Sequence, residues 1–133
     1  MNWKIIPDSW AGPLLSLLRI VTALLFMAHG TQKYFGIPPS DGGPPPLFSV
    51  MGISGLFEIV FGVLILIGLM TRVSAFLMSG MMAIAYWMVH FPMSPYPSIN
   101  HGEPAVLFCF IFLYIAAAGP GPWSVDASRA PAS

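Results

Sequence analysis

Charged residues are scarce in this sequence. Only 8% of its 133 residues are Asp, Glu, Lys or Arg, whereas 56% are hydrophobic, and an average soluble domain carries about 25% charged residues. A chain this apolar is typical of an integral membrane protein. The five basic and five acidic residues also cancel, which leaves no basic surplus to neutralise phosphates, so we expect no nucleic-acid partner.

Cysteine is almost absent as well. Cys109 is the single cysteine, and it lies inside an apolar run. One cysteine excludes an internal disulfide, a CxxC redox pair and any cysteine-held iron–sulfur or zinc cluster within the chain. If the protein takes part in electron transfer, the redox group must be something other than a cysteine pair or cluster.

Long apolar stretches make up most of the remaining sequence. About 20 apolar residues cross the hydrocarbon core of a bilayer as a helix, and breaks rich in glycine and proline separate the stretches. We expect helices at about residues 13–35, 47–70, 72–91 and 103–118. The sequence therefore predicts an all-α fold, an integral membrane four-helix bundle with four transmembrane helices, in which residues 1–133 form a single domain. The short break at residues 68–72 predicts a tight hairpin.

The second stretch carries one carboxylate, Glu58, near its centre. An acidic side chain at mid-membrane costs on the order of 3 kcal/mol, so Glu58 should face the protein interior and find a proton or a cationic partner. Arg19 is the structural partner that we expect, directly or through a water. Ser54 and Gly62 lie one turn to either side of Glu58, and small residues at this spacing let membrane helices approach closely. We therefore expect Glu58 at a tight helix contact.

Other titratable side chains gather near the ends of three predicted helices. His29 and Lys33 lie four residues apart and so project from one side of the first helix. Glu103 opens the fourth helix, where a carboxylate also suits the positive end of the helix dipole. We expect these three side chains to converge, with His90 nearby at the end of the third helix. The alternative is that His29, Lys33 and His90 are headgroup-level residues that extend to water.

The basic residues indicate an orientation. Four helices place both termini and the turn at 68–72 on one membrane side, and that side collects every Lys and Arg except Lys33. Because Lys and Arg favour the cytoplasmic side, we expect a multi-pass protein of the bacterial inner membrane with both termini in the cytoplasm.

Short motifs follow one another in a definite order along these helices. They are Arg19, His29-Gly30-x-x-Lys33, Glu58 with Gly62, Gly68-Leu69-x-Thr71-Arg72, Asn100-x-Gly102-Glu103 and Gly119-Pro120-Gly121. With this order and spacing the chain resembles the DoxX family from Arg19 to about Asp126. The resemblance implies a four-helix integral membrane protein, in a family named after a subunit of an archaeal thiosulfate:quinone oxidoreductase.

The resemblance also implies a quinone-linked oxidoreductase component, which passes electrons to quinone from a partner protein or a small sulfur-type substrate. Quinone reduction takes two electrons and two protons, so its site needs hydrogen-bond donors, a proton source and aromatic walls. The catalytic groups that we expect are Glu58, Glu103, His29 and Lys33. The quinone-binding residues that we expect are Phe26, His29, Lys33, Tyr86, Trp87 and His90. His29 and His90 lie at the same end of their predicted helices, so they could also act as the two ligands of a haem. No other feature supports a haem, and we expect quinone instead.

Two other function classes stay open. The chain could be a non-catalytic membrane anchor or assembly subunit of a redox complex, in which the charged residues only hold the helices together. It could also be a small transporter, for which a four-helix protomer would need to form a homo-oligomer. The partners that we expect are membrane lipid and a redox partner protein.

Overall fold

The computed structural model describes residues 3–130, and within this range the chain consists of helices and connecting turns, with no strand. The elements are η1 (Asp8–Trp10), α1 (Ala11–Phe35), α2 (Val50–Ile67), α3 (Thr71–Ala85), η2 (Tyr86–His90), α4 (Glu103–Ala118) and α5 (Val125–Arg129). The predicted all-α class is confirmed. The helix α2 is shorter at both ends than the predicted 47–70, and η2 continues α3 as a π-helical turn.

Three helical stretches are long and apolar enough to cross a membrane. They are Asp8–Phe35, Val50–Ile67 and Thr71–His90. The fourth, α4, is also apolar but has 16 residues, or roughly 24 Å of helix at 1.5 Å per residue. Large apolar side chains such as Leu24 and Val60 are exposed on the outside of the bundle, as expected of helices whose neighbour is lipid rather than water.

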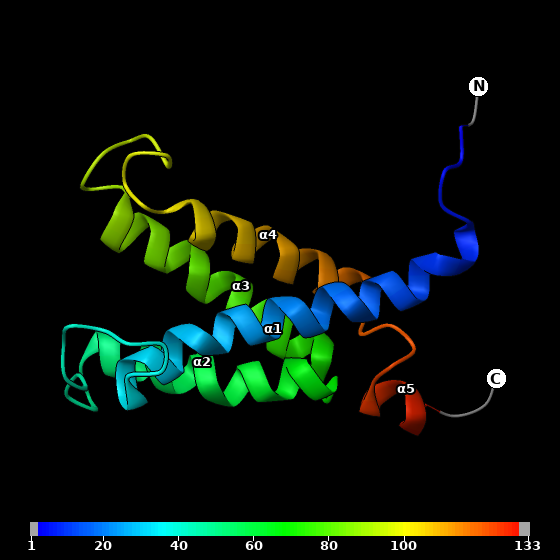
Figure 1. The fold of residues 1–133 in the computed structure, drawn as a ribbon, viewed down its shortest axis with the longest axis horizontal. Coiled ribbons are helices and arrows are strands. Elements are labelled where there is room, and N and C mark those ends of the chain that lie inside the picture. The colour runs from blue at the N-terminus through cyan, green and yellow to red at the C-terminus, as the bar shows by residue number, and fades with distance from the viewer. Residues whose placement is uncertain (1–2, 131–133) are drawn as a thin grey trace.

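The four long helices form two antiparallel hairpins. Helix α1 packs mainly against α2, and α3 packs mainly against α4, while the contacts between the two hairpins are fewer. Figure 1 shows the hairpins close together at the end that carries both termini and diverging toward the other end. The two proline-rich loops, residues 36–49 and 91–102, lie at the divergent end.

A tight turn joins the hairpins at the end where they meet. Gly68 adopts the left-handed conformation (φ 72°) and ends α2, as is common at helix C-termini. The Asp126 carboxylate then accepts hydrogen bonds from the backbone N–H groups of Met70 (2.9 Å) and Thr71 (2.8 Å) and so caps α3. Partial burial alone would raise the pKa of Asp126, but the hydrogen bonds from Thr71 and Met70 and the charge of Arg129 lower it below its ordinary value.

Glycines bring α1 and α2 into close contact. A Cβ atom at Gly30 would lie 2.7 Å from the Gly55 carbonyl oxygen, and one at Gly62 would overlap with Cγ of Met27. Glu58 lies between these two contacts on α2 and is 4% exposed. Its expected position at a close helix contact is therefore confirmed.

Candidate functional site

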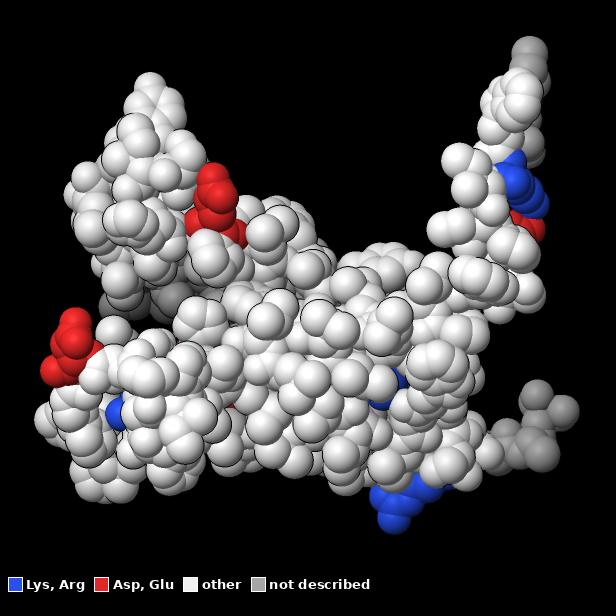
Figure 2. Space-filling model, viewed as in Figure 1, with Lys and Arg blue, Asp and Glu red and all other residues white. Residues whose placement is uncertain are grey.

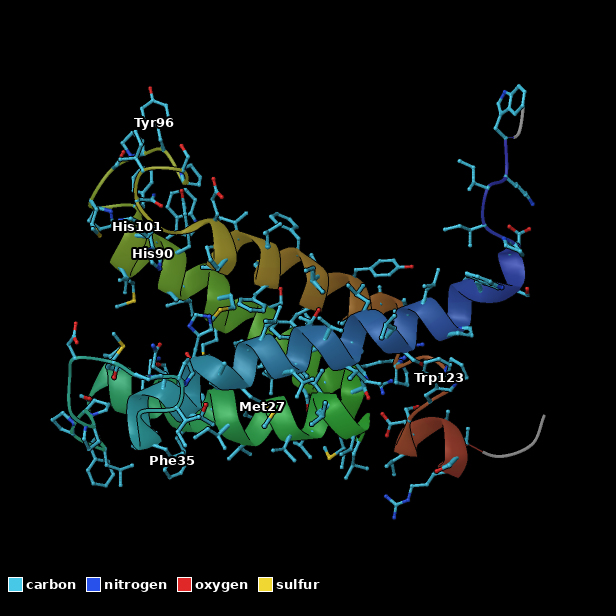
Figure 3. The ribbon with its side chains drawn as sticks, in the orientation of Figure 1. Met27, Phe35, His90, Tyr96, His101 and Trp123 are labelled. Atoms are coloured by element: carbon cyan, nitrogen blue, oxygen red, sulfur yellow. The ribbon has the colours of Figure 1, made fainter. Side chains whose placement is uncertain are left out.

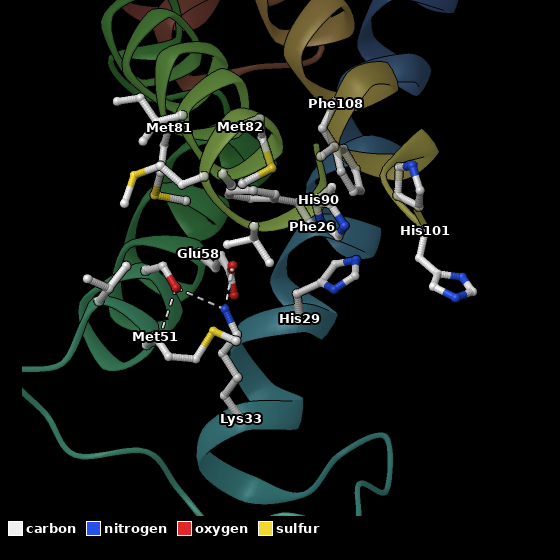
Figure 4. Close-up of a pocket in the computed structure, with 18 residues that line it drawn as sticks. Phe26, His29, Lys33, Met51, Glu58, Met81, Met82, His90, His101 and Phe108 are labelled. Carbon is white, nitrogen blue, oxygen red and sulfur yellow. Dashed lines mark hydrogen bonds and ion pairs between the residues drawn. The ribbon is translucent and has the colours of Figure 1, made fainter. Parts of the chain in front are cut away.

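A cavity of about 320 Å³ lies between the hairpins where they diverge. Pockets for small organic molecules usually occupy about 300–1,000 Å³. Side chains from α1, α2, α3, η2 and α4 line this cavity, and most of them are apolar. The polar ones are His29, Lys33, Ser54, Glu58, His90 and His101. Figure 4 shows the labelled members of this group around the cavity, and Figure 2 shows a hollow between the hairpins at the same end.

A buried ion pair forms one wall of the cavity. Lys33 Nζ lies 2.9 Å from Glu58 Oε1 and 3.0 Å from Ser54 Oγ, and the Lys33 and Glu58 side chains are 20% and 6% exposed. The Lys33 stem crosses α2 at Gly55, where a Cβ atom would lie 3.0 Å from Lys33 Cδ. The glycine therefore makes room for the lysine to extend from the last turn of α1 to the middle of α2.

The predicted pairing of Arg19 with Glu58 is wrong. The Arg19 guanidinium is fully buried at the opposite end of α1 and donates to the carbonyl oxygens of Pro120 and Trp123, the latter at 2.6 Å. The antiparallel register explains the difference, because the contact of Gly30 with Gly55 places Lys33 beside Glu58 and Arg19 beside Gly68, at the turn between α2 and α3. The structural role expected of Arg19 is retained, with backbone carbonyls in place of the carboxylate.

One oxygen of Glu58 has no hydrogen-bond partner in the part of the chain that the structure describes. Among residues 3–130, no donor reaches Oε2, although the residue is 4% exposed and lines the cavity. Buried polar atoms in native proteins are nearly always paired, so an unpaired carboxylate oxygen requires an explanation.

His90 lies on another wall, in the π-helical turn η2. Its Nδ1 is 2.9 Å from the Asn100 carbonyl oxygen. Because a carbonyl can only accept, Nδ1 carries the hydrogen, and in an uncharged ring Nε2 is then an acceptor that no donor within residues 3–130 uses. The buried Asn100 side chain holds the loop in place, since it donates to the Ser94 carbonyl (2.8 Å) and accepts from the Gly102 N–H (2.8 Å). Figure 3 shows His90 and His101 at this loop, far from Trp123.

The remaining predicted site residues divide into two groups. Phe26 and His29 line the cavity as expected. Tyr86 and Trp87 do not line it: Tyr86 is buried with its hydroxyl 3.4 Å from Asn100 Nδ2, and Trp87 is 60% exposed. The prediction that Tyr86 and Trp87 form aromatic walls of the quinone site is therefore not met by this cavity.

Glu103 does not line the cavity either, although the neighbouring Pro104 does. It is exposed in the first turn of α4 and forms no ion pair or hydrogen bond with His29 or Lys33. The structure does not bring these three side chains together as predicted. The position of Glu103 suits a carboxylate at the positive end of a helix dipole, and its catalytic role stays a prediction.

Sequence reasoning missed the wall that α4 contributes. Ala105 and Phe108 line the cavity, and Phe108 lies edge to face with Phe26 at a ring-centroid distance of 5.5 Å. Phe112 continues this contact at 4.9 Å from Phe26. The spacing of Ala105, Phe108 and Phe112 marks one helix face, which could have been compared with the helix face that carries Phe26.

Residues 14–91 match the DoxX family. The chain belongs to the DoxX family. It is 38% identical over 117 residues to an uncharacterized protein of Haemophilus influenzae, an alignment that covers 84% of this chain and 87% of the relative. It is also 30% identical over 82 residues to an uncharacterized membrane protein of Mycobacterium tuberculosis, covering 56% of this chain and 49% of that protein. No solved structure matches the chain significantly.

The DoxX match includes most of the cavity. Helix α2, helix α1 from residue 14 onward and the segment α3–η2 lie inside residues 14–91, so the match includes Lys33, Glu58 and His90. The wall from α4 lies outside the matched segment. The family assignment therefore covers the charged part of the site.

Proposed function

We propose that this DoxX protein is the quinone-binding membrane component of an oxidoreductase and that its cavity holds the quinone headgroup. The observation that carries the proposal is the ion pair of Lys33 and Glu58, which is largely buried in the wall of a mostly apolar cavity. Ionisable residues inside a membrane are costly and commonly serve a function. An ammonium has three N–H donors, and with Ser54 and Glu58 using two, the third can serve a ligand oxygen.

The apolar part of the cavity suits a substituted ring. Phe26 and Phe108 provide aromatic surface, and the thioethers of Met81 and Met82 adapt to irregular apolar shapes. Two further lining residues, Met51 and Met88, are 53% and 62% exposed, so the cavity reaches the surface of the protein. In this proposal a membrane-soluble quinone enters there from the lipid.

Quinone reduction consumes two electrons and two protons. In this proposal the electrons come from a redox partner protein. The protons enter from the loop end, where His29 and His101 are exposed and also line the cavity. An imidazole nitrogen can both accept and donate a proton, so both residues suit this task.

We further propose that the protein lies in the bacterial inner membrane with both termini in the cytoplasm. Figure 1 shows both termini at the end where the hairpins meet. Lys4, Arg72 and Arg129 are exposed there, and basic residues favour the cytoplasmic side. A reporter that functions only in the cytoplasm should be active when it is fused after Ala130. Activity of a reporter that functions only in the periplasm would contradict the proposed orientation.

Quinone binding can be tested with a cavity-filling variant. Ala85 lines the cavity, and Ala85→Phe should block it, whereas Ala118→Phe places the same side chain on the exposed far end of α4. Purified proteins would be extracted with organic solvent, and the extract analysed for quinone by mass spectrometry, followed by titration with a short-chain quinone. The wild type and Ala118→Phe should bind quinone, and Ala85→Phe should not. Absence of binding to the wild type would favour the non-catalytic anchor, in which Lys33 and Glu58 only hold α1 to α2.

A further inference from the structure

The cavity carries two hydrogen-bond acceptors that no donor in the described part of the chain uses. Among residues 3–130, Glu58 Oε2 has no partner although its residue is 4% exposed. His90 gives its Nδ1 hydrogen to the Asn100 carbonyl at 2.9 Å, which leaves Nε2 of the neutral ring as an acceptor. The two groups belong to different walls, since Glu58 comes from α2 and His90 from η2, and both line the cavity.

We propose that the site selects the reduced, dihydroxy form of its ligand, with one quinol hydroxyl donating to Glu58 Oε2 and the other to His90 Nε2. The inference rests on the proposed function and adds the redox form that the site prefers. A quinone has carbonyl oxygens and no hydroxyl hydrogen, so it would place an acceptor against the Glu58 carboxylate. Facing acceptors without a hydrogen between them leave both groups unpaired.

The ion pair fits the same ligand. Lys33 Nζ donates to Glu58 Oε1 at 2.9 Å, so the ammonium lies directly against the carboxyl group that the ligand would meet. The lysine's remaining N–H can donate to the oxygen of the hydroxyl that binds Oε2, because a hydroxyl both donates and accepts. The quinol then satisfies the carboxylate oxygen, the imidazole nitrogen and the third lysine hydrogen, whereas of these three groups the quinone can use only the lysine hydrogen.

The preference should be measurable as a ratio of dissociation constants. A hydrogen bond to a buried charged group is among the stronger ones in proteins, so we expect quinol to bind about tenfold more tightly than quinone. For a two-electron couple, a tenfold preference raises the midpoint potential of the bound couple by about 30 mV relative to the free couple.

Three ligands with the same ring and alkyl chain test this inference. Decylubiquinone, its quinol kept reduced under anaerobic conditions, and the quinol dimethyl ether would be titrated into the purified protein in detergent. The dimethyl ether keeps the shape of the quinol but has no hydroxyl hydrogen to donate. The wild type should bind the quinol about tenfold more tightly than either of the other two.

Substitutions then assign the preference to the two acceptors. In Glu58→Gln a neutral amide replaces the carboxylate, and the ratio of quinone to quinol dissociation constants should fall toward one. His90→Phe removes the other acceptor and should lower the ratio independently, which keeps the test valid if Glu58→Gln folds poorly. Asp41→Asn makes the same chemical change at an exposed loop position near the same end and should leave the ratio unchanged.

The outcomes separate this inference from the proposed function. Equal binding of quinone and quinol by the wild type, or tighter binding of quinone, would overturn the preference while quinone binding still stands. A ratio unchanged in both Glu58→Gln and His90→Phe would also overturn it. Failure of all three ligands to bind would overturn both proposals. A roughly tenfold ratio of dissociation constants in the wild type, lowered in both Glu58→Gln and His90→Phe, would support both.

Discussion

Breaking the ion pair of Lys33 and Glu58 should destabilise the bundle in a non-additive way. Removing one partner of a buried pair leaves an uncompensated charge and commonly costs about 3–5 kcal/mol. Because Glu58 is 4% exposed, we expect Lys33→Met to cost about 3 kcal/mol. Glu58→Gln leaves the more exposed Lys33, which keeps its bond to Ser54, so we expect about 1–2 kcal/mol.

The double variant Lys33→Met/Glu58→Gln removes both charges together. It should cost about 2 kcal/mol, less than the summed costs of the single variants, which corresponds to a coupling energy of about 2 kcal/mol. Unfolding in detergent, followed by circular dichroism or differential scanning fluorimetry at a fixed detergent concentration, measures all the variants.

Arg19 provides a matched control for this cycle. Arg19→Lys keeps the charge but cannot serve the carbonyl oxygens of Pro120 and Trp123 with the same planar fork of donors. Since Arg19 and Glu58 share no partner, the effects of Arg19→Lys and Glu58→Gln should add within about 0.5 kcal/mol. Coupling between Arg19 and Glu58, together with additivity between Lys33 and Glu58, would refute the pairing that the structure shows.

Three further changes test other parts of the structure. Gly30→Ala should destabilise the protein by about 1–3 kcal/mol, because its Cβ would lie 2.7 Å from the Gly55 carbonyl oxygen; Gly80→Ala, which meets no atom within 4 Å, should not destabilise it in the same detergent melt. Asp126→Asn weakens the cap on α3 and should cost about 1 kcal/mol at neutral pH. Since the folded-state pKa of Asp126 is lowered, its contribution is present above the unfolded pKa of about 3.9 and is lost as pH falls through the folded pKa; an equal acid-induced loss in Asp126→Asn and wild type would contradict this.

The sequence by itself determined the class of the protein and the approximate extent of its helices. The scarcity of charge over 133 residues requires lipid around the helices. Glycine and proline interrupt the apolar stretches, and both residues act locally on the backbone. The turn after Gly68 is such a local effect, since its left-handed conformation (φ 72°) suits glycine. The order of the short motifs was sufficient to indicate the DoxX family.

Only the tertiary structure decided which residues meet. Arg19 and Lys33 lie on the same helix, and the sequence could show that Glu58 needs a cation but not which of the two lies opposite it. The register that decides this depends on the close contact of Gly30 with Gly55, which no local preference encodes. Helix rotation likewise turned Phe108 into the cavity and left Trp87 outside it, because the face that a helix presents depends on how the two hairpins pack.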